Sequence, residues 1–212
     1  MEKNKKNKIK LIDLILPNKK INLFIITVLV LGIISGSIFL MIATDIDKSS
    51  VIGQIQTFFK NISNGAINDG LALRNSLIIN YLFVGGIWLL GFSMIGVLVN
   101  IFLTYIKGFL VGFSVASIFL TYSYKGILAS ILYVFFSQIL NIIVVLVLAI
   151  YSIMFAKNLL QIIVVKNNTN NRLMLKRYVV ILMFSIIISF ISSVLEVYVF
   201  PNVLKLFIQY YL

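Results

Sequence analysis

The sequence predicts an all-α membrane protein, a polytopic helix bundle with about five transmembrane helices. Of its 212 residues, 61% are hydrophobic and 11% are charged, whereas soluble domains carry about a quarter charged residues. The charges lie in the gaps between long apolar runs. The longest run, residues 78–122, contains 45 residues and a single charge, Lys107. One crossing needs about 20 apolar residues, so this run is predicted to cross the membrane twice.

The first predicted span, residues 21–43, carries no charge. It is longer than the apolar core of a signal peptide, so we expect an uncleaved transmembrane helix. Residues 1–20 before it form a basic cytoplasmic tail. Ile9, Ile12 and Leu16 in this tail, with the neighbouring lysines, fit either a helix on anionic membrane lipid or a disordered segment that only sets orientation.

Residues 44–77 form the predicted outer loop, which contains apolar residues at helical spacing: Val51, Ile55, Phe58, Phe59 and Ile62. This spacing predicts an amphipathic helix that ends near Gly65. The helix could lie on the outer leaflet, offer a docking face to a partner, or pack on the bundle.

The remaining predicted spans are residues 78–103, 108–122, 127–156 and 178–200. Asn100 to Lys107 is the expected turn between the second and third spans. The fourth span is long enough to be tilted or broken, and Pro201 is expected to stop the fifth. The whole chain, residues 1–212, is then one integral membrane domain.

Lysine and arginine placement predicts the orientation, because short cytoplasmic loops retain positive charge. With the N-terminus inside, 13 of the 18 basic residues lie on the cytoplasmic side and 5 on the outer side. We therefore expect a cytoplasmic N-terminus and an extracytoplasmic C-terminus. The net charge of +12 comes from basic residues whose positions match a membrane topology, so it does not indicate a nucleic-acid partner.

Cysteine and histidine are both absent. This absence excludes disulfides, thiolate nucleophiles, His/Cys metal sites and imidazole catalysis. The sequence also shows no Walker loop, no paired catalytic carboxylates and no nucleophile arrangement. We therefore expect no catalytic residue, no cofactor and no metal.

Small residues recur at four-residue spacing in three spans: Gly32 with Gly36, Gly108 with Gly112 and Ala116, and Ser185 with Ser189 and Ser193. Gly91 and Gly96 are assigned the same role. Because glycine lets helix backbones approach closely, these residues are expected to pack helices together. The contact could lie within one chain, in a homo-oligomer or against a partner.

Glu196 is the single acidic residue within the predicted spans, and a carboxylate there must be neutral, paired or in a polar crevice. Ser189, Ser192 and Ser193 share its helical face. Its position near the outer boundary favours Lys125 or Arg74 as its partner and leaves Lys107, expected at the inner boundary, out of reach. Glu196 could couple to a partner protein or form a structural ion pair.

Gln138 and Asn141 place two amides on one face of the fourth span. They could bond another helix, line a polar crevice or mark a break in the helix. With Glu196, Ser192, Ser193 and Lys107 they form the predicted set of intramembrane polar residues.

Several short motifs in order resemble the stage II sporulation protein M family over nearly the whole chain. They are Gly32-Ile-Ile-Ser-Gly36, Trp88-Leu-Leu-Gly-Phe-Ser-Met-Ile-Gly96, Lys107-Gly-Phe-Leu-Val-Gly-Phe113, the Gln138 region and Ser193-Val-Leu-Glu-Val-Tyr-Val-Phe-Pro201. The chain departs from many relatives at Ser137, where they have proline, and from the broader family at Gln138, where histidine is frequent.

The resemblance implies a non-enzymatic scaffold for forespore engulfment in sporulation. It would recruit two peptidoglycan-degrading partners, stage II sporulation proteins D and P, to the septum. The residues themselves leave another function open, a permease-like subunit of a transport complex, on the basis of Glu196, the serine face and the amides of the fourth span. That function needs a continuous water-accessible path.

Overall fold

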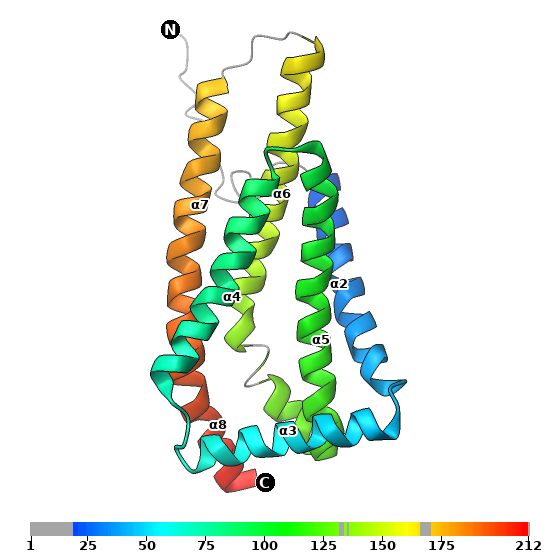
Figure 1. Cartoon of the computed structure of the whole chain (residues 1–212), viewed down its shortest axis with the longest axis vertical. Coiled ribbons are helices and arrows are strands. Elements are labelled where there is room, and N and C mark those ends of the chain that lie inside the picture. Colours follow the sequence, from blue (N-terminus) through cyan, green and yellow to red (C-terminus); the bar gives the residue numbers. More distant parts are fainter. Residues whose placement is uncertain (1–18, 132–133, 135, 166–170, 212) are drawn as a thin grey trace, which may run out of the picture.

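The computed structural model describes residues 19–131, 134, 136–165 and 171–211, and this part of the chain forms helices without strands. In chain order these are α2 (Lys19–Met41), α3 (Asp45–Ser63), α4 (Asp69–Leu90), α5 (Met94–Ser130), α6 (Phe136–Val165), α7 (Asn171–Val194), the π-helical segment η2 (Leu195–Val199) and α8 (Phe200–Tyr211). Five of the described helical stretches are long and apolar enough to cross a membrane, which confirms the predicted polytopic fold. Figure 1 shows these helices side by side, with α3 across one end, here called the α3 end.

Helix α3 confirms the amphipathic helix predicted in the outer loop. The Thr44 side chain caps its start by accepting a hydrogen bond from the Asp47 N–H at 3.3 Å. Its end lies before Gly65, whose φ of 64° gives the left-handed turn that commonly closes a helix. Phe59 and Ile62 are buried in a core cluster shared with α5 and α8. The helix therefore packs on the bundle.

The turn between the second and third spans lies at residues 91–93, earlier than predicted. The predicted spans 78–103 and 108–122 are therefore wrong in their bounds, which are Asp69–Leu90 for α4 and Met94–Ser130 for α5. A Cβ on Gly96 would overlap the Leu90 carbonyl oxygen, and one on Gly91 would overlap the Tyr178 hydroxyl. Both glycines thus permit the tight turn and its packing.

The predicted fourth span falls in two helices, because α5 ends at Ser130 and α6 begins at Phe136. Before it, backbone angles at Ser123 (φ 53°, ψ −132°) interrupt α5, and the chain folds back so that Gly126 lies against the Ile118 carbonyl. Helix α6 then begins at Phe136 and continues to Val165. The apolar helix within it is Ser137–Ile162, so the predicted bounds of 127–156 are shifted.

Pro201 does not stop the fifth span, which corrects the prediction of a helix over residues 178–200. Helix α7 continues through η2 into α8, and the apolar stretch is Met174–Leu206. Pro201 is the second residue of α8. A proline inside a continuous helix removes one backbone N–H and usually bends or breaks the helix, and here it lies two residues after the π-helical turn η2, where the hydrogen-bond pattern is already irregular.

Helices α2 and α5 meet through their glycines. A Cβ on Gly32 would overlap the Tyr105 carbonyl oxygen, and one on Gly112 would overlap the Ile33 carbonyl oxygen. Gly36 and Gly108 are equally close to the facing backbone. The Ser37 hydroxyl also donates across the contact to the Gly112 carbonyl at 3.1 Å. Both glycine pairs therefore pack within one chain.

Two clusters of buried apolar side chains hold the bundle together. One lies at the α3 end and joins α3, α5 and α8. The other joins α2, α4 and α6, with partly buried side chains of α5 and α7 packed against it. We call the second cluster the apolar layer; its buried members are Ile25, Val84, Ile87, Val144, Val145, Leu148, Ala149 and Ile150.

Candidate polar site inside the bundle

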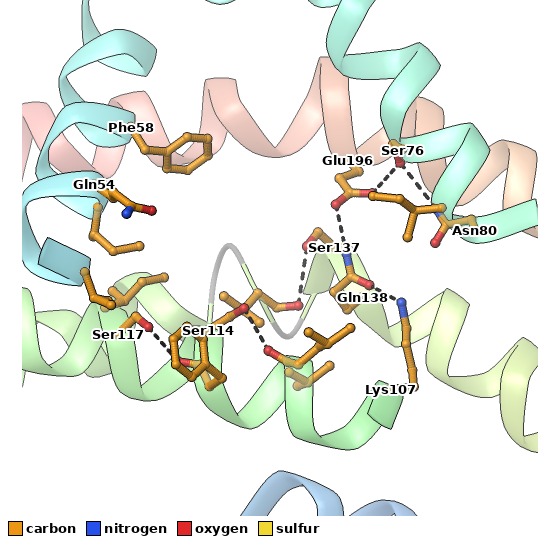
Figure 2. Close-up of a pocket in the computed structure, with 18 residues that line it drawn as sticks. Gln54, Phe58, Ser76, Asn80, Lys107, Ser114, Ser117, Ser137, Gln138 and Glu196 are labelled. Carbon is orange, nitrogen blue, oxygen red and sulfur yellow. Dashed lines mark hydrogen bonds between the residues drawn. The ribbon is translucent and has the colours of Figure 1, made fainter. Parts of the chain in front are cut away.

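Lys107, Gln138 and Glu196 form a hydrogen-bonded chain between three helices. The Lys107 Nζ donates to Gln138 Oε1 at 2.9 Å, and Gln138 Nε2 donates to Glu196 Oε1 at 2.8 Å. Figure 2 shows the amide between the two charged side chains. Gln138 therefore links the buried cation to the carboxylate, with one end of its amide facing each charge.

Helix α4 supplies a second hydrogen-bond donor to the carboxylate. Ser76 donates to Glu196 Oε2 at 2.6 Å, so each carboxylate oxygen accepts one hydrogen bond. Asn80, one turn further along α4, donates to Ser76 at 3.3 Å and to Ser193 at 2.9 Å. The serine face predicted on the fifth span thus contributes directly to this network, through Ser193.

The helices are irregular where they supply these residues. Gln138 is the third residue of α6, whose start follows the break in the fourth span. Glu196 lies in η2, a π-helical turn within an otherwise α-helical span. Single π-helical turns occur often at functional sites, because the extra residue turns a side chain to a new direction. Both irregularities therefore aim polar groups at one point.

Lys107 is within reach of Glu196 through Gln138, so the prediction that placed it out of reach is wrong. The residue lies 13 positions after Met94, the start of α5, or about 20 Å along the helix at 1.5 Å per residue. It is therefore inside the bundle, with 5% of its surface exposed. The predicted partners Lys125 and Arg74 make no described contact with the carboxylate, which accepts from Ser76 and Gln138.

A cavity of about 430 Å³ opens beside this cluster. Its polar end holds Lys107, Gln138, Glu196, Ser76 and Asn80. Apolar side chains of α3, α4 and α5 form most of the remaining wall, and α3 covers the cavity at the α3 end. The wall residues are Val51, Ile55, Phe58, Ile79, Leu110, Val111, Phe113, Ile118 and Val134, with Gln54, Ser114, Ser117 and Ser137 among them.

Other predicted polar residues lie deeper in the bundle. Ser192 is buried and donates to the Ser137 carbonyl at 3.4 Å, across α7 and α6. Asn141 is 2% exposed, and neither its side-chain oxygen nor its nitrogen has a described partner. The Ser189 hydroxyl is also buried without a described partner. Gln138 and Asn141 therefore share a face, but only Gln138 belongs to the hydrogen-bonded chain.

A second polar cluster was not predicted. Asn100, fully buried in α5, donates to the Ile87 carbonyl at 3.0 Å and to Ser152. The Tyr178 hydroxyl donates to the Trp88 carbonyl at 2.8 Å, and its ring stacks on Phe155. An asparagine within an apolar run was the available signal. It had been interpreted as a turn residue.

The apolar layer separates these two polar clusters. On α6, Val144 to Ile150 lie between Asn141 and Ser152. On α4, Val84 and Ile87 lie between Asn80 and the turn at residue 91. Side chains of all five apolar helices pack in or against this layer. Among the described residues, none of the second cluster lines the cavity, and packed apolar side chains lie between the two.

The polar site contains one cation and one carboxylate, so its formal charges balance. Within the described residues there is no group of three or more His, Cys, Asp or Glu side chains that could hold a metal ion. The chemical capacity of the site is hydrogen bonding, with serine hydroxyls, amides and one ammonium as the available groups. Such an arrangement suits structural coupling or the binding of a ligand.

The fold and the site define a multi-pass α-helical membrane protein with a charged pair buried between its helices. Within this class, the chain belongs to the Stage II sporulation protein M family, whose model matches residues 24–201. It is thus a sporulation-related membrane protein. No curated protein and no solved structure matches the chain significantly.

Proposed function

We propose that this protein is a non-enzymatic membrane scaffold for engulfment of the forespore. It would recruit stage II sporulation proteins D and P, the peptidoglycan-degrading partners, at the septum and in the engulfing mother-cell membrane. The observation that carries this proposal is the family match over residues 24–201. Cell-wall hydrolysis would belong to the partners, and the chain would hold them in place.

The surface of α3 supports a scaffold role. Phe59 and Ile62 fix one side of this helix to the bundle, while Thr57 and Asn61 are exposed on the opposite side. The predicted orientation places this surface outside the cell, on the side where peptidoglycan lies. A helix held by a buried core can present polar side chains with little cost in conformational entropy on binding.

The apolar layer argues against the permease-like alternative. A transported solute or ion would need a polar path between the two clusters, and packed side chains of five apolar helices lie between them. The polar residues that suggested transport, Glu196 and the amides, are therefore confined to one half of the bundle. We favour the scaffold for this reason.

The test is recovery of partners from sporulating cells with a tagged full-length chain. Wild type should co-purify stage II sporulation proteins D and P and concentrate at the septum. The double variant Thr57→Arg/Asn61→Arg should reduce recovery about tenfold or more, the loss expected when a binding surface acquires bulky charges. Gln161→Arg, at an exposed position at the other end of the bundle, is the matched control.

A wild-type chain that recovers no hydrolase and spreads uniformly through the membrane would contradict the scaffold role. Equal recovery by the α3 variant and wild type would instead remove α3 as the contact surface. Cleavage of peptidoglycan by the purified chain alone would contradict the non-enzymatic assignment.

A further inference from the structure

The cavity beside Lys107 reaches the lipid-facing surface of the bundle. Ile79 of α4 and Leu110 of α5 both line it, and they are 52% and 46% exposed. Figure 1 shows α4 and α5 joined at one end and separated toward the α3 end, and residues of α3, α4 and α5 form most of the cavity wall. A molecule dissolved in the bilayer can therefore enter sideways, between α4 and α5.

The deep end of the cavity offers hydrogen-bond donors. Lys107 is 5% exposed, and its single described hydrogen bond, to Gln138, uses one of the three ammonium protons. Its other described contact is the face of the Phe83 ring, 5.4 Å away. A buried ammonium gains when further oxygen atoms accept its protons, so a ligand with oxygen acceptors is favoured at this point.

The balance of charge indicates that this ligand is uncharged. Lys107 is already matched by Glu196 through Gln138. An added carboxylate or phosphate would leave a net negative charge within a low-dielectric region, and such charge is costly inside a membrane. Hydroxyl or ester oxygens can accept from the ammonium without this cost.

The rest of the cavity suits an alkyl chain. Its wall is formed largely by Ile, Leu, Val and Phe side chains, and Ser114 and Ser117 direct their hydroxyls to carbonyls of their own helix. Its volume of about 430 Å³ lies within the usual range for ligand pockets. An elongated molecule with one polar end matches both the shape and the chemistry.

We propose that this cavity binds an uncharged membrane amphiphile of the glyceride type. Its hydroxyl or ester oxygens would accept hydrogen bonds from Lys107, and its acyl chain would lie between α4 and α5 beneath α3. This site is independent of the proposed scaffold function, because it depends only on the contacts within the chain.

The test uses the full-length chain in nanodiscs and a monoacylglycerol that carries a photoreactive diazirine on its acyl chain. After irradiation, mass spectrometry locates the labelled peptides. Label should concentrate on the cavity walls, at Ile79, Leu110 and Val111, and excess monoolein should displace it. A fatty acid with the same diazirine chain should label the cavity about tenfold less at neutral pH, because of its charge.

Two variants and one control complete the experiment. Ser114→Trp fills the cavity from its α5 wall and should reduce cavity labelling about tenfold or more; Lys107→Met should weaken it about tenfold, as for one lost hydrogen bond to a charged donor. Leu98→Trp, on the lipid-facing side of α5, should leave it unchanged. If Lys107→Met does not fold, cavity labelling of Ser114→Trp tests the proposal instead.

Labelling spread evenly over the lipid-facing helices would overturn the proposal, as would cavity labelling that Ser114→Trp leaves unchanged. Equal labelling by the fatty acid would overturn the preference for an uncharged ligand. None of these outcomes bears on recovery of the hydrolases, so this proposal and the scaffold function can fail separately.

Discussion

Substitution of Gly112 by leucine tests the contact between α2 and α5 directly. A Cβ at this position would overlap the carbonyl oxygen, carbonyl carbon and Cα of Ile33, which are backbone atoms of the facing helix. Backbone atoms of a helix cannot move away by a change of rotamer, as a flexible side chain can. The two helices must therefore separate. Overpacking of a tight core costs about 1–3 kcal/mol, and we expect Gly112→Leu to reach or exceed the upper part of this range.

Gly85→Leu is the matched control, because a Cβ on Gly85 meets no heavy atom within 4 Å. Both substitutions replace a glycine inside a long apolar helix, so changes in helix propensity and apolar volume are alike. The assay is unfolding in detergent, followed by thermal melting or by titration with a denaturing detergent. Gly112→Leu should unfold well before wild type and Gly85→Leu close to it. Equal stability of the two variants would refute the reasoning.

Two further predictions concern Lys107–Glu196 and the end of α3. Lys107→Met and Glu196→Gln each leave one charge unmatched, and they should show a coupling of about 0.5–3 kcal/mol in a double-mutant cycle measured by unfolding. Additive effects would show that Gln138 does not link the two charges energetically. Gly65→Val should destabilise the protein by about 1–2 kcal/mol, because Gly65 has a φ of 64° that a β-branched residue rarely adopts. Unchanged melting of this variant would contradict that cost.

The sequence predicted the helical class, the number of apolar helices and the glycine contacts, because these depend on local composition and spacing. It misplaced the turn between the second and third spans. Asn100 and Lys107 were taken as loop residues because they are polar, but both are buried between helices. Residues 91–93 form the actual turn and include Phe92, so no run of polar residues marks it.

The error in the turn carried over to the polar site. With Lys107 placed at the inner boundary, Glu196 had to find a partner elsewhere, although its helical face was assigned correctly. The π-helical turn at Leu195–Val199 and the start of α6 at Phe136 also determine which side chains meet. Neither follows from hydrophobic periodicity. Lys107, Gln138, Glu196 and Ser193 were thus predicted as polar residues, whereas Ser76, Asn80 and the pairing of the whole network required the three-dimensional arrangement.

The glycine contact between α2 and α5 also limits how copies of this protein could associate. Small-residue patterns on membrane helices commonly mediate dimers. Here Gly32, Gly36, Gly108 and Gly112 are each covered by the other helix of the same chain. A second copy could reach these residues only after the first pair of helices had come apart. Quaternary contacts of the intact protein must therefore be built from other faces, such as the exposed sides of α4 and α7.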